Sequence, residues 1–284
     1  AAAKVNLTLE VLGRRGDGYH EIRTVMQTVD LADRVVLEDS ESLELRTRTP
    51  GIPTDATNLA MRAALALRDA ARVKHGVRIA LEKRIPVAAG LGGGSTDAAA
   101  VLLGLNRLWR LRWPRARLEE IAVTLGMDVP FFLRGGAALG TGRGEHLKPL
   151  QTMGLSLVLV SPQIGVSTAE TYARVTPAMF TAGEHSRALE TALRGGRPAQ
   201  IADHLYNGLE AAVGPAGRQV VRIKAALLAA GALGAAMSGS GPTVFGIARS
   251  WEHARQIRTR LARVSWACWA VRALRGSAVR LRPR

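Results

Sequence analysis

One glycine-rich segment constrains this chain more than any other feature of its sequence. Residues 86–100 read PVAAGLGGGSTDAAA, so Gly90, Gly92, Gly93 and Gly94 lie in one loop that continues directly into a helical pattern. Because glycine has no Cβ, such a loop can turn tightly and bring its N–H groups against a ligand. The helix that follows adds its positive dipole end and its unpaired N–H groups at the same point. The segment therefore predicts an anion site, and phosphate is the most common ligand of such sites.

Other interpretations of this segment explain less of it. A surface turn before a helix capped by Ser95 or Thr96 needs only one glycine, and four are present. A Walker A loop requires a lysine after the glycines, and none follows. The G-x-G-x-x-G loop of dinucleotide sites and protein kinases requires a third glycine where this chain has Ser95. The residues alone thus indicate a phosphate loop of another type.

The composition is that of a globular chain. With 284 residues, 47% of them hydrophobic, the chain can bury one large core or two smaller ones. No apolar run approaches the ~20 residues needed to cross a bilayer. The chain shows no signal pattern, and the single Cys268 cannot form an internal disulfide. By exclusion we expect a cytoplasmic protein without a membrane partner, as a monomer or weak homodimer.

The formal net charge of +16 is high enough to raise the question of nucleic-acid binding. The basic residues are nevertheless spread along the chain, and only 5 of the 39 are lysines. This skew indicates a general preference for arginine, so we expect no nucleic-acid partner. Two of the lysines, Lys4 and Lys83, lie in or beside the motifs described below, where a compact ammonium is favoured over a planar guanidinium.

Hydrophobic periodicity predicts a mixture of helices and strands. Residues 3–12 alternate between apolar and polar side chains, which predicts a half-buried strand with Lys4 and Asn6 on its polar face. The glycine loop leads into a helix expected over 95–109. Further helices are expected over 58–73, 118–125, 220–230 and 251–264, strands over 19–31, 34–48, 77–81, 132–150, 155–160 and 266–273, a strand–turn–strand unit over 231–246, and a loop over a pocket at 162–177.

Three segments together resemble the motifs of the GHMP kinases, the small-molecule kinases named after galactokinase, homoserine kinase, mevalonate kinase and phosphomevalonate kinase. Residues 86–100 resemble their phosphate loop, residues 3–9 (AKVNLTL) their first motif and residues 237–245 (MSGSGPTVF) their third. The match stays in register from the first residues to about Phe245.

The resemblance implies an α+β fold of two domains with the site between them. Residues 1–152 would form an ATP-binding domain like ribosomal protein S5 domain 2. Residues 153–284 would form a ferredoxin-like C-terminal substrate domain.

Asp128 and Lys4 are the catalytic residues that the resemblance implies. Asp128 lies in the segment LGMDVPFF, residues 125–132, where the residues alone favour a helix N-cap. In the family the corresponding Asp is the base that removes the proton of the acceptor hydroxyl, and one carboxylate oxygen could cap while the other reaches the substrate. Lys4, by itself a surface charge, would lie beside Asp128, keep it ionised and orient the hydroxyl.

The resemblance also implies how ATP is bound. Asn58 and Lys83 are expected near the adenosine. Mg²⁺ is expected to bridge the phosphate oxygens, but no protein ligand for it can be assigned, and the remaining histidines show no metal-ligand spacing. The residues expected around the phosphates are Pro86, Val87, Ala88, Ala89, Gly90, Leu91, Gly92, Gly93, Gly94, Ser95 and Thr96.

Within the family, residues 13–20 (GRRGDGYH) and 125–132 are most similar to the members that act on a cytidine substrate. The implied acceptor is a small molecule, a cytidine diphosphate-linked methylerythritol of the non-mevalonate isoprenoid pathway, phosphorylated on its 2-hydroxyl. Tyr19 and Tyr172 would stack on the cytosine and His20 would form a hydrogen bond with it. Asn6 and the turn Gly239-Ser240-Gly241 would complete the substrate side, although the residues alone favour strand positions for Tyr19 and His20 and a plain hairpin turn at 239–241.

Two other functions stay open. Another GHMP kinase, of the homoserine or mevalonate type, would give the two tyrosines no role, because those acceptors carry no nucleobase. A non-catalytic nucleotide- or RNA-binding protein on the same fold is supported only by the charge. The chain also departs from the family at residues 207–210, where NGLE replaces the common NDLE of a C-terminal helix.

Overall fold

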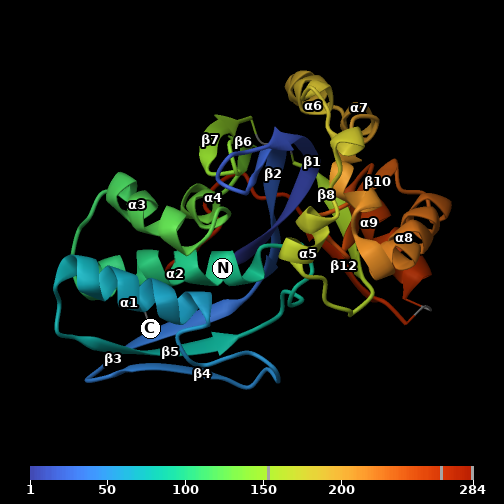
Figure 1. The fold of residues 1–284 in the computed structure, drawn as a ribbon. Coiled ribbons are helices and arrows are strands. Elements are labelled where there is room, and N and C mark those ends of the chain that lie inside the picture. The colour runs from blue at the N-terminus through green and yellow to red at the C-terminus, as the bar shows by residue number, and fades with distance from the viewer. Residues whose placement is uncertain (152–153, 263–264, 283–284) are drawn as a thin grey trace.

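The computed structural model describes residues 1–151, 154–262 and 265–282, and its strands form three sheets (Figure 1). The long antiparallel strands β1 and β2 stand between two groups of helices (Figure 1). They belong to a five-stranded sheet with the order β7 (His146–Leu150), β6 (Ala137–Thr141), β2 (His20–Ala32), β1 (Ala2–Arg14) and β9 (Tyr206–Asn207).

Strand β1 is buried on both faces, so the prediction of a half-buried strand is wrong. Its polar residues lie against other polar groups instead of solvent: Thr8 shares a hydrogen bond of 2.9 Å with Ser186, and the Asn6 N–H donates to Ser238 Oγ at 3.3 Å. The alternation is real, but the later part of the chain covers the polar face. Burial therefore brings Lys4 and Asn6 into the interior, where polar groups need partners.

A four-stranded antiparallel sheet forms the second half of the chain. Its order is β10 (Gly234–Met237), β11 (Val244–Ala248), β8 (Ser156–Ser161) and β12 (Ala267–Arg272), with α8 (Gly217–Ala229) and α9 (Trp251–Leu261) packed against it. This is the β-α-β-β-α-β arrangement of ferredoxin-like folds. The helix expected over 251–264 begins as predicted at Trp251 and ends at Leu261. Residues 263–264 lie outside the described part of the chain.

The third sheet and four helices form the other half (Figure 1). Strands β3 (Arg34–Ser40), β5 (Gly76–Glu82) and β4 (Leu43–Thr47) lie in that order, with β4 parallel to β5. The core beneath them includes Ile79, Leu102 and the adjacent rings of Phe131 and Phe132. The helices are α1 (Leu59–Ala71), α2 (Gly93–Leu108), α3 (Arg115–Leu125) and α4 (Val129–Arg134).

Several segments differ from their prediction. The strand-like stretch 132–150 begins inside α4, and the loop over 162–177 contains the short helix α5 (Thr168–Ala173), which Ser167 caps. Residues 208–211 form a 3₁₀ turn. The elements without a prediction are β9 (Tyr206–Asn207), α6 (Glu184–Gly195), α7 (Pro198–Ala202) and the 3₁₀ turns η1 (Pro177–Met179) and η3 (Gly214–Ala216).

The expected domain boundary, between residues 152 and 153, lies outside the described residues. The chain also crosses back over it, because β9 pairs in parallel with β1 at Thr8 and Leu9. The division into residues 1–152 and 153–284 therefore stays a prediction.

Candidate active site

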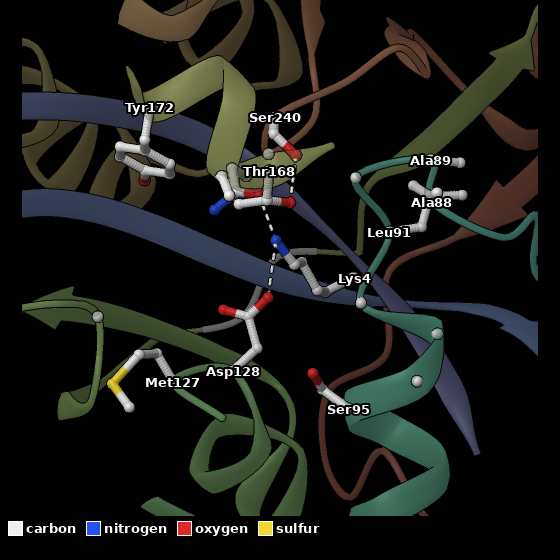
Figure 2. A pocket seen from close by; sticks show the side chains of 18 of the residues that line it. Lys4, Ala88, Ala89, Leu91, Ser95, Met127, Asp128, Thr168, Tyr172 and Ser240 are labelled. Atoms are coloured by element: carbon white, nitrogen blue, oxygen red, sulfur yellow. Dashed lines mark hydrogen bonds and ion pairs between the residues drawn. The ribbon is translucent and has the colours of Figure 1, made fainter. Parts of the chain in front are cut away.

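A pocket of about 1210 Å³ lies where the two halves meet. Its walls come from β1, the glycine loop, the start of α4, helix α5 and the turn between β10 and β11 (Figure 2). The predicted residues Lys4, Asn6, Tyr19, His20, Asn58, Lys83, 86–95, Asp128, Tyr172, Gly239 and Ser240 line this pocket. Sequence positions from both ends of the chain thus meet in one cavity.

Two predicted residues lie elsewhere. Thr96 is fully buried within α2, and its N–H donates to the Gly92 carbonyl at 2.9 Å. Gly241 packs against Met237, whose sulfur would be 2.4 Å from a Cβ at that position. Neither residue lines the pocket.

The glycine loop, residues 86–92, is shaped by close backbone approaches. Gly90 has φ +76°, and a Cβ there would lie 2.0 Å from the Ser238 carbonyl oxygen. Gly92 has φ +70°, and a Cβ there would lie 2.6 Å from the Phe132 ring. A side chain at either position is excluded by both the backbone conformation and the neighbour. The glycines are therefore required by packing, as well as by any ligand.

Helix α2 begins at the pocket without a capping side chain among the described residues. Gly92 occupies the N-cap position, and Ser95 and Thr96 lie inside the first turn, so the capping interpretation of these residues is wrong. The first N–H groups of a helix have no partner within it. Because Gly92, Gly93, Gly94 and Ser95 all line the pocket, these N–H groups are available there to an anion.

Lys4 and Asp128 meet across the pocket floor (Figure 2). The Lys4 ammonium lies 3.3 Å from Asp128 Oδ2 and donates to Asn6 Oδ1 at 2.6 Å. Asn6 in turn donates to Thr24 Oγ1 at 2.8 Å, so the ammonium is held in place. The Lys4 side chain is 5% exposed and the Asp128 side chain 34%, so the carboxylate is the member of the pair that the pocket can reach.

Asp128 does not cap α4. It occupies the N-cap position, but its side chain makes no capping hydrogen bond, so the expectation that one oxygen caps the helix is wrong. Pro130, in the first turn, supplies no N–H to such a bond. The carboxylate therefore pairs with Lys4 and is accessible to a ligand in the pocket.

Aromatic rings gather at the far end of the pocket. The His20 and Tyr172 rings lie 5.4 Å apart between centroids and are tilted by 32°. Tyr19 is 51% exposed, and the Arg143 guanidinium lies 5.1 Å from its ring. Burial, with the nearby charge of Arg14, lowers the pKa of His20, which favours the neutral imidazole that can both donate and accept.

Sequence analysis missed Arg143. Its side chain is held by Glu145, with Arg143 Nε 3.0 Å from Glu145 Oε1, and both follow β6 in a turn. An arginine in a chain of many arginines gives no signal of its own. Its position beside Tyr19 depends on this turn, and packing between distant residues cannot be predicted from periodicity.

Asn58 and Lys83 line the pocket, and their polar groups are engaged by the protein. Asn58 Oδ1 caps α1 by accepting a hydrogen bond from the Ala60 N–H at 2.9 Å. Asn58 Nδ2 donates to the Pro53 carbonyl at 2.8 Å. Lys83 bonds Asp97 Oδ2 at 2.7 Å and also pairs with Asp33. Burial raises the pKa of Asp97 to about 7, with Lys83 opposing the shift and Asp33 adding to it.

The segment around α5 is tied to both the glycine loop and the turn at 238–241. The Val166 N–H donates to the Ala88 carbonyl at 3.0 Å, and the hydroxyls of Thr168 and Ser240 lie 2.8 Å apart (Figure 2). Helix α5 also carries Tyr172. The loop that would hold phosphate and the ring that would hold a base are therefore linked through one short segment.

Among the described residues, one group of three brings possible metal ligands within 4.8 Å of one another: Glu10, Glu184 and His185. None of the three lines the pocket. The His185 ring stacks on Tyr206 at 3.8 Å, and Glu10 accepts from the Ser186 N–H at 2.8 Å. Partners within the protein therefore account for the positions of these side chains.

Comparison with known proteins agrees with this geometry. The family model of the GHMP kinases N terminal domain matches residues 58–136, and that of the GHMP kinases C terminal matches residues 189–265. The chain is 47% identical over 266 residues to 4-diphosphocytidyl-2-C-methyl-D-erythritol kinase of Pelotomaculum thermopropionicum, covering 93% of each chain. It belongs to the GHMP kinase family.

Further relatives and solved structures extend the similarity. The protein of the same name from Symbiobacterium thermophilum is 46% identical, over 96% of this chain and 98% of its own. A crystal structure of 4-(cytidine 5'-diphospho)-2C-methyl-D-erythritol kinase superposes with a TM-score of 0.82 at 40% identity, covering 96% and 97%. L. major mevalonate kinase shares the fold alone, with a TM-score of 0.74 at 18% identity, covering 96% and 94%.

The predicted fold class, an α+β GHMP kinase fold, is thus confirmed. As a GHMP kinase, the chain is a small-molecule kinase that uses ATP. The described part of the chain contains no helix long and apolar enough to cross a bilayer.

The packing around Gly90 predicts a loss of stability in Gly90→Ala. The new Cβ would meet the Ser238 carbonyl at a positive φ, so the free energy of unfolding should fall by about 2–4 kcal/mol. Urea unfolding measures the change. Gly276→Ala is the matched control, because nothing lies within 4 Å of that position. Equal stability of the two variants would contradict the close approach.

The raised pKa of Asp97 predicts a pH-dependent effect of Asp97→Asn. Asp97 has a pKa of about 7 in the folded protein and about 3.8 in the unfolded chain. Protonation of Asp97 therefore stabilises the folded state at low pH, and this stabilisation is lost as the pH rises from about 4 to about 7. The stability of the variant relative to wild type should therefore rise between pH 4 and pH 8, by a few kcal/mol at most, since one pKa unit corresponds to about 1.4 kcal/mol.

Urea unfolding of both proteins across this pH range checks the prediction. Asp39→Asn, at an exposed position of β3, serves as the control and should show no such trend. A difference between Asp97→Asn and wild type that stays constant with pH would show that Asp97 titrates normally.

Proposed function

We propose that this GHMP kinase transfers the γ-phosphoryl group of ATP to the 2-hydroxyl of 4-diphosphocytidyl-2-C-methyl-D-erythritol, giving the 2-phosphate and ADP. One observation carries the proposal: a single pocket joins an uncapped helix N-terminus, a Lys4–Asp128 pair and an aromatic end built from His20 and Tyr172. Relatives that cover nearly the whole chain carry the name of this kinase.

ATP would bind with its phosphates against the start of α2. The N–H groups of residues 92–95 favour phosphate oxygens, and the Ser95 hydroxyl faces the same space (Figure 2). Asn58, Ile52 and Pro53 line the adjoining part of the pocket, where an adenosine would lie. Phosphoryl transfer asks mainly for positioning and charge stabilisation, which this arrangement can supply.

Asp128 would act as the base. It takes the proton of the acceptor hydroxyl as that oxygen forms a bond to the γ-phosphorus, while the bond from this phosphorus to the bridging oxygen breaks and ADP leaves. Lys4, 3.3 Å from Asp128 Oδ2, would orient the carboxylate and stabilise negative charge on the phosphoryl oxygens. The network through Asn6 and Thr24 fixes the direction of the ammonium.

The Mg²⁺ that accompanies ATP would neutralise charge on the phosphate oxygens. We assign no protein ligand to this ion.

The cytosine would lie at the aromatic end, between Tyr19 and Tyr172. A planar base offers two faces for stacking, and the neutral His20 imidazole can form a hydrogen bond with its edge. Homoserine and mevalonate carry no such ring, so kinases for those acceptors would leave this end without a ligand.

An assay of ADP release tests the substrate. The cytidine substrate, homoserine and mevalonate are each supplied with ATP and Mg²⁺. Turnover restricted to the cytidine substrate supports the proposal, and preferred turnover of either other acceptor would replace it. Binding to RNA that falls steeply with salt, without any ADP release, would favour a nucleic-acid function instead.

We also propose that the chain acts in the cytoplasm, as a monomer or weak homodimer, without a nucleic-acid partner. The support is its similarity to small-molecule kinases and the spread of its basic residues along the sequence. Sedimentation at several protein concentrations would measure the oligomeric state.

Removal of the base should reduce turnover without affecting nucleotide binding. In Asp128→Ala we expect kcat to fall at least ~10²-fold, because the hydroxyl loses its proton acceptor, with nearly unchanged ATP affinity. Steady-state kinetics and ADP titration measure the two quantities. Asp39→Ala is the control for loss of one carboxylate. Unchanged turnover in Asp128→Ala would remove Asp128 from the mechanism.

Loss of the Tyr172 ring should act on binding. In Tyr172→Ala we expect KM for the cytidine substrate to rise about tenfold with a smaller change in kcat, since stacking is worth ~1–3 kcal/mol per base and is equal in ground and transition states. Tyr172→Phe keeps the ring and should retain a KM near wild type. A KM that does not respond to loss of the ring would place the cytosine elsewhere.

A further inference from the structure

We propose that Lys83, Asp33 and Asp97 position the phosphate loop from beneath, and that Lys83 acts through these two carboxylates and not as a ligand of the nucleotide. The proposal rests on the proposed function, because it assigns a task to residues around the same ATP site. Lys83 was expected to lie near the adenosine, and the proposal gives its ammonium a different task.

The three side chains come from three separate elements. Asp33 follows β2, Lys83 follows β5, and Asp97 lies in the first part of α2. The ammonium bonds Asp97 Oδ2 at 2.7 Å and Asp33 Oδ2, and the exposed fractions of the three side chains are 6%, 3% and 0% for Lys83, Asp97 and Asp33. Buried charges of this kind require fixed partners, so the geometry of the group is well defined.

The group holds both ends of the loop. Asp33 Oδ1 accepts from the N–H groups of Arg84 and Ile85, at 2.6 and 2.9 Å, which fixes the segment that enters the loop. Asp97 belongs to the helix that leaves it. Lys83 joins the two carboxylates, and its Nζ lies 3.1 Å from where a Cβ on Gly93 would be, directly beneath the first residue of α2. The direction of the helix N-terminus thus depends on one ammonium.

The charge of the group argues against a role as an attractive surface for phosphate. One ammonium faces two carboxylates, so the fully ionised group carries one excess negative charge beside an anion site. Charge alone predicts that removal of Asp97 would tighten ATP binding. Burial also disfavours the ionised form of Asp97. Its position is therefore explained by the hydrogen bond that it accepts from Lys83, and not by attraction to a nucleotide.

The test uses two variants of Asp97 in the full chain. Asp97→Leu removes the acceptor and leaves Lys83 paired with Asp33, and Asp97→Asn keeps a weaker acceptor. We expect Asp97→Leu to weaken ADP binding and raise KM for ATP about tenfold, because hydrogen bonds to charged groups are among the stronger ones in proteins. Asp97→Asn should show a smaller effect, and KM for the cytidine substrate should be unchanged in both.

This pattern separates positioning from general destabilisation. A merely structural role would reduce the active fraction, which lowers kcat, and would leave both KM values unchanged. Lys148→Met and Asp39→Leu, at exposed positions of β7 and β3, are the charge-matched controls and should retain wild-type nucleotide affinity.

Tighter or unchanged ADP binding in Asp97→Leu would overturn the proposal. Weaker binding in Lys83→Met alone would then identify Lys83 as a direct nucleotide ligand. ADP binding is measured without any acceptor, so the result does not depend on the cytidine substrate. An enzyme that prefers another acceptor but shows the expected loss of ADP affinity would overturn the proposed function and support the positioning role.

Discussion

The contact between Gly90 and Ser238 joins the two halves of the molecule at the pocket. Ser238 Oγ donates to the Gly90 carbonyl at 2.9 Å and accepts from the Asn6 N–H at 3.3 Å. Strand β1, the phosphate loop and the turn between β10 and β11 therefore share one hydroxyl group. A larger residue at position 90 would push the loop away from the turn, and with it the start of α2.

A row of buried polar groups along β1 extends this arrangement to Lys4 and Asp128. Asn6 connects the shared hydroxyl to the Lys4 ammonium, and Lys4 connects to Asp128. Buried polar groups cost stability unless each is bonded, and here Thr24 on β2 supplies the remaining partner of Asn6. These partners hold the Lys4 ammonium in one orientation. A catalytic ammonium on a long flexible side chain gains from such restraint, because less freedom remains to be lost in the transition state.

The sequence was informative where a single segment determines its own structure. Helical spacing located α1 and α8, alternation located β1, and the glycine run located the loop that leads into α2. It was not informative where structure depends on partners distant in the chain. The burial of both faces of β1, the placement of Arg143 beside Tyr19 and the pairing of Lys83 with Asp33 and Asp97 all arise from contacts between remote segments. Thr96 shows the same limit, since helical phase turns it into the core while Ser95 faces the pocket.

The Asp33–Lys83–Asp97 group places a destabilising buried carboxylate beneath the glycine loop. A buried carboxylate with a raised pKa is a cost to the folded state near neutral pH, and an apolar residue at that position would remove the cost. The same residue would leave the start of α2 without its link to the segment that enters the loop. Local rules are broken most often where a site must keep one geometry. An unfavourable charge beneath an anion site is consistent with selection for the position of the backbone N–H groups above it.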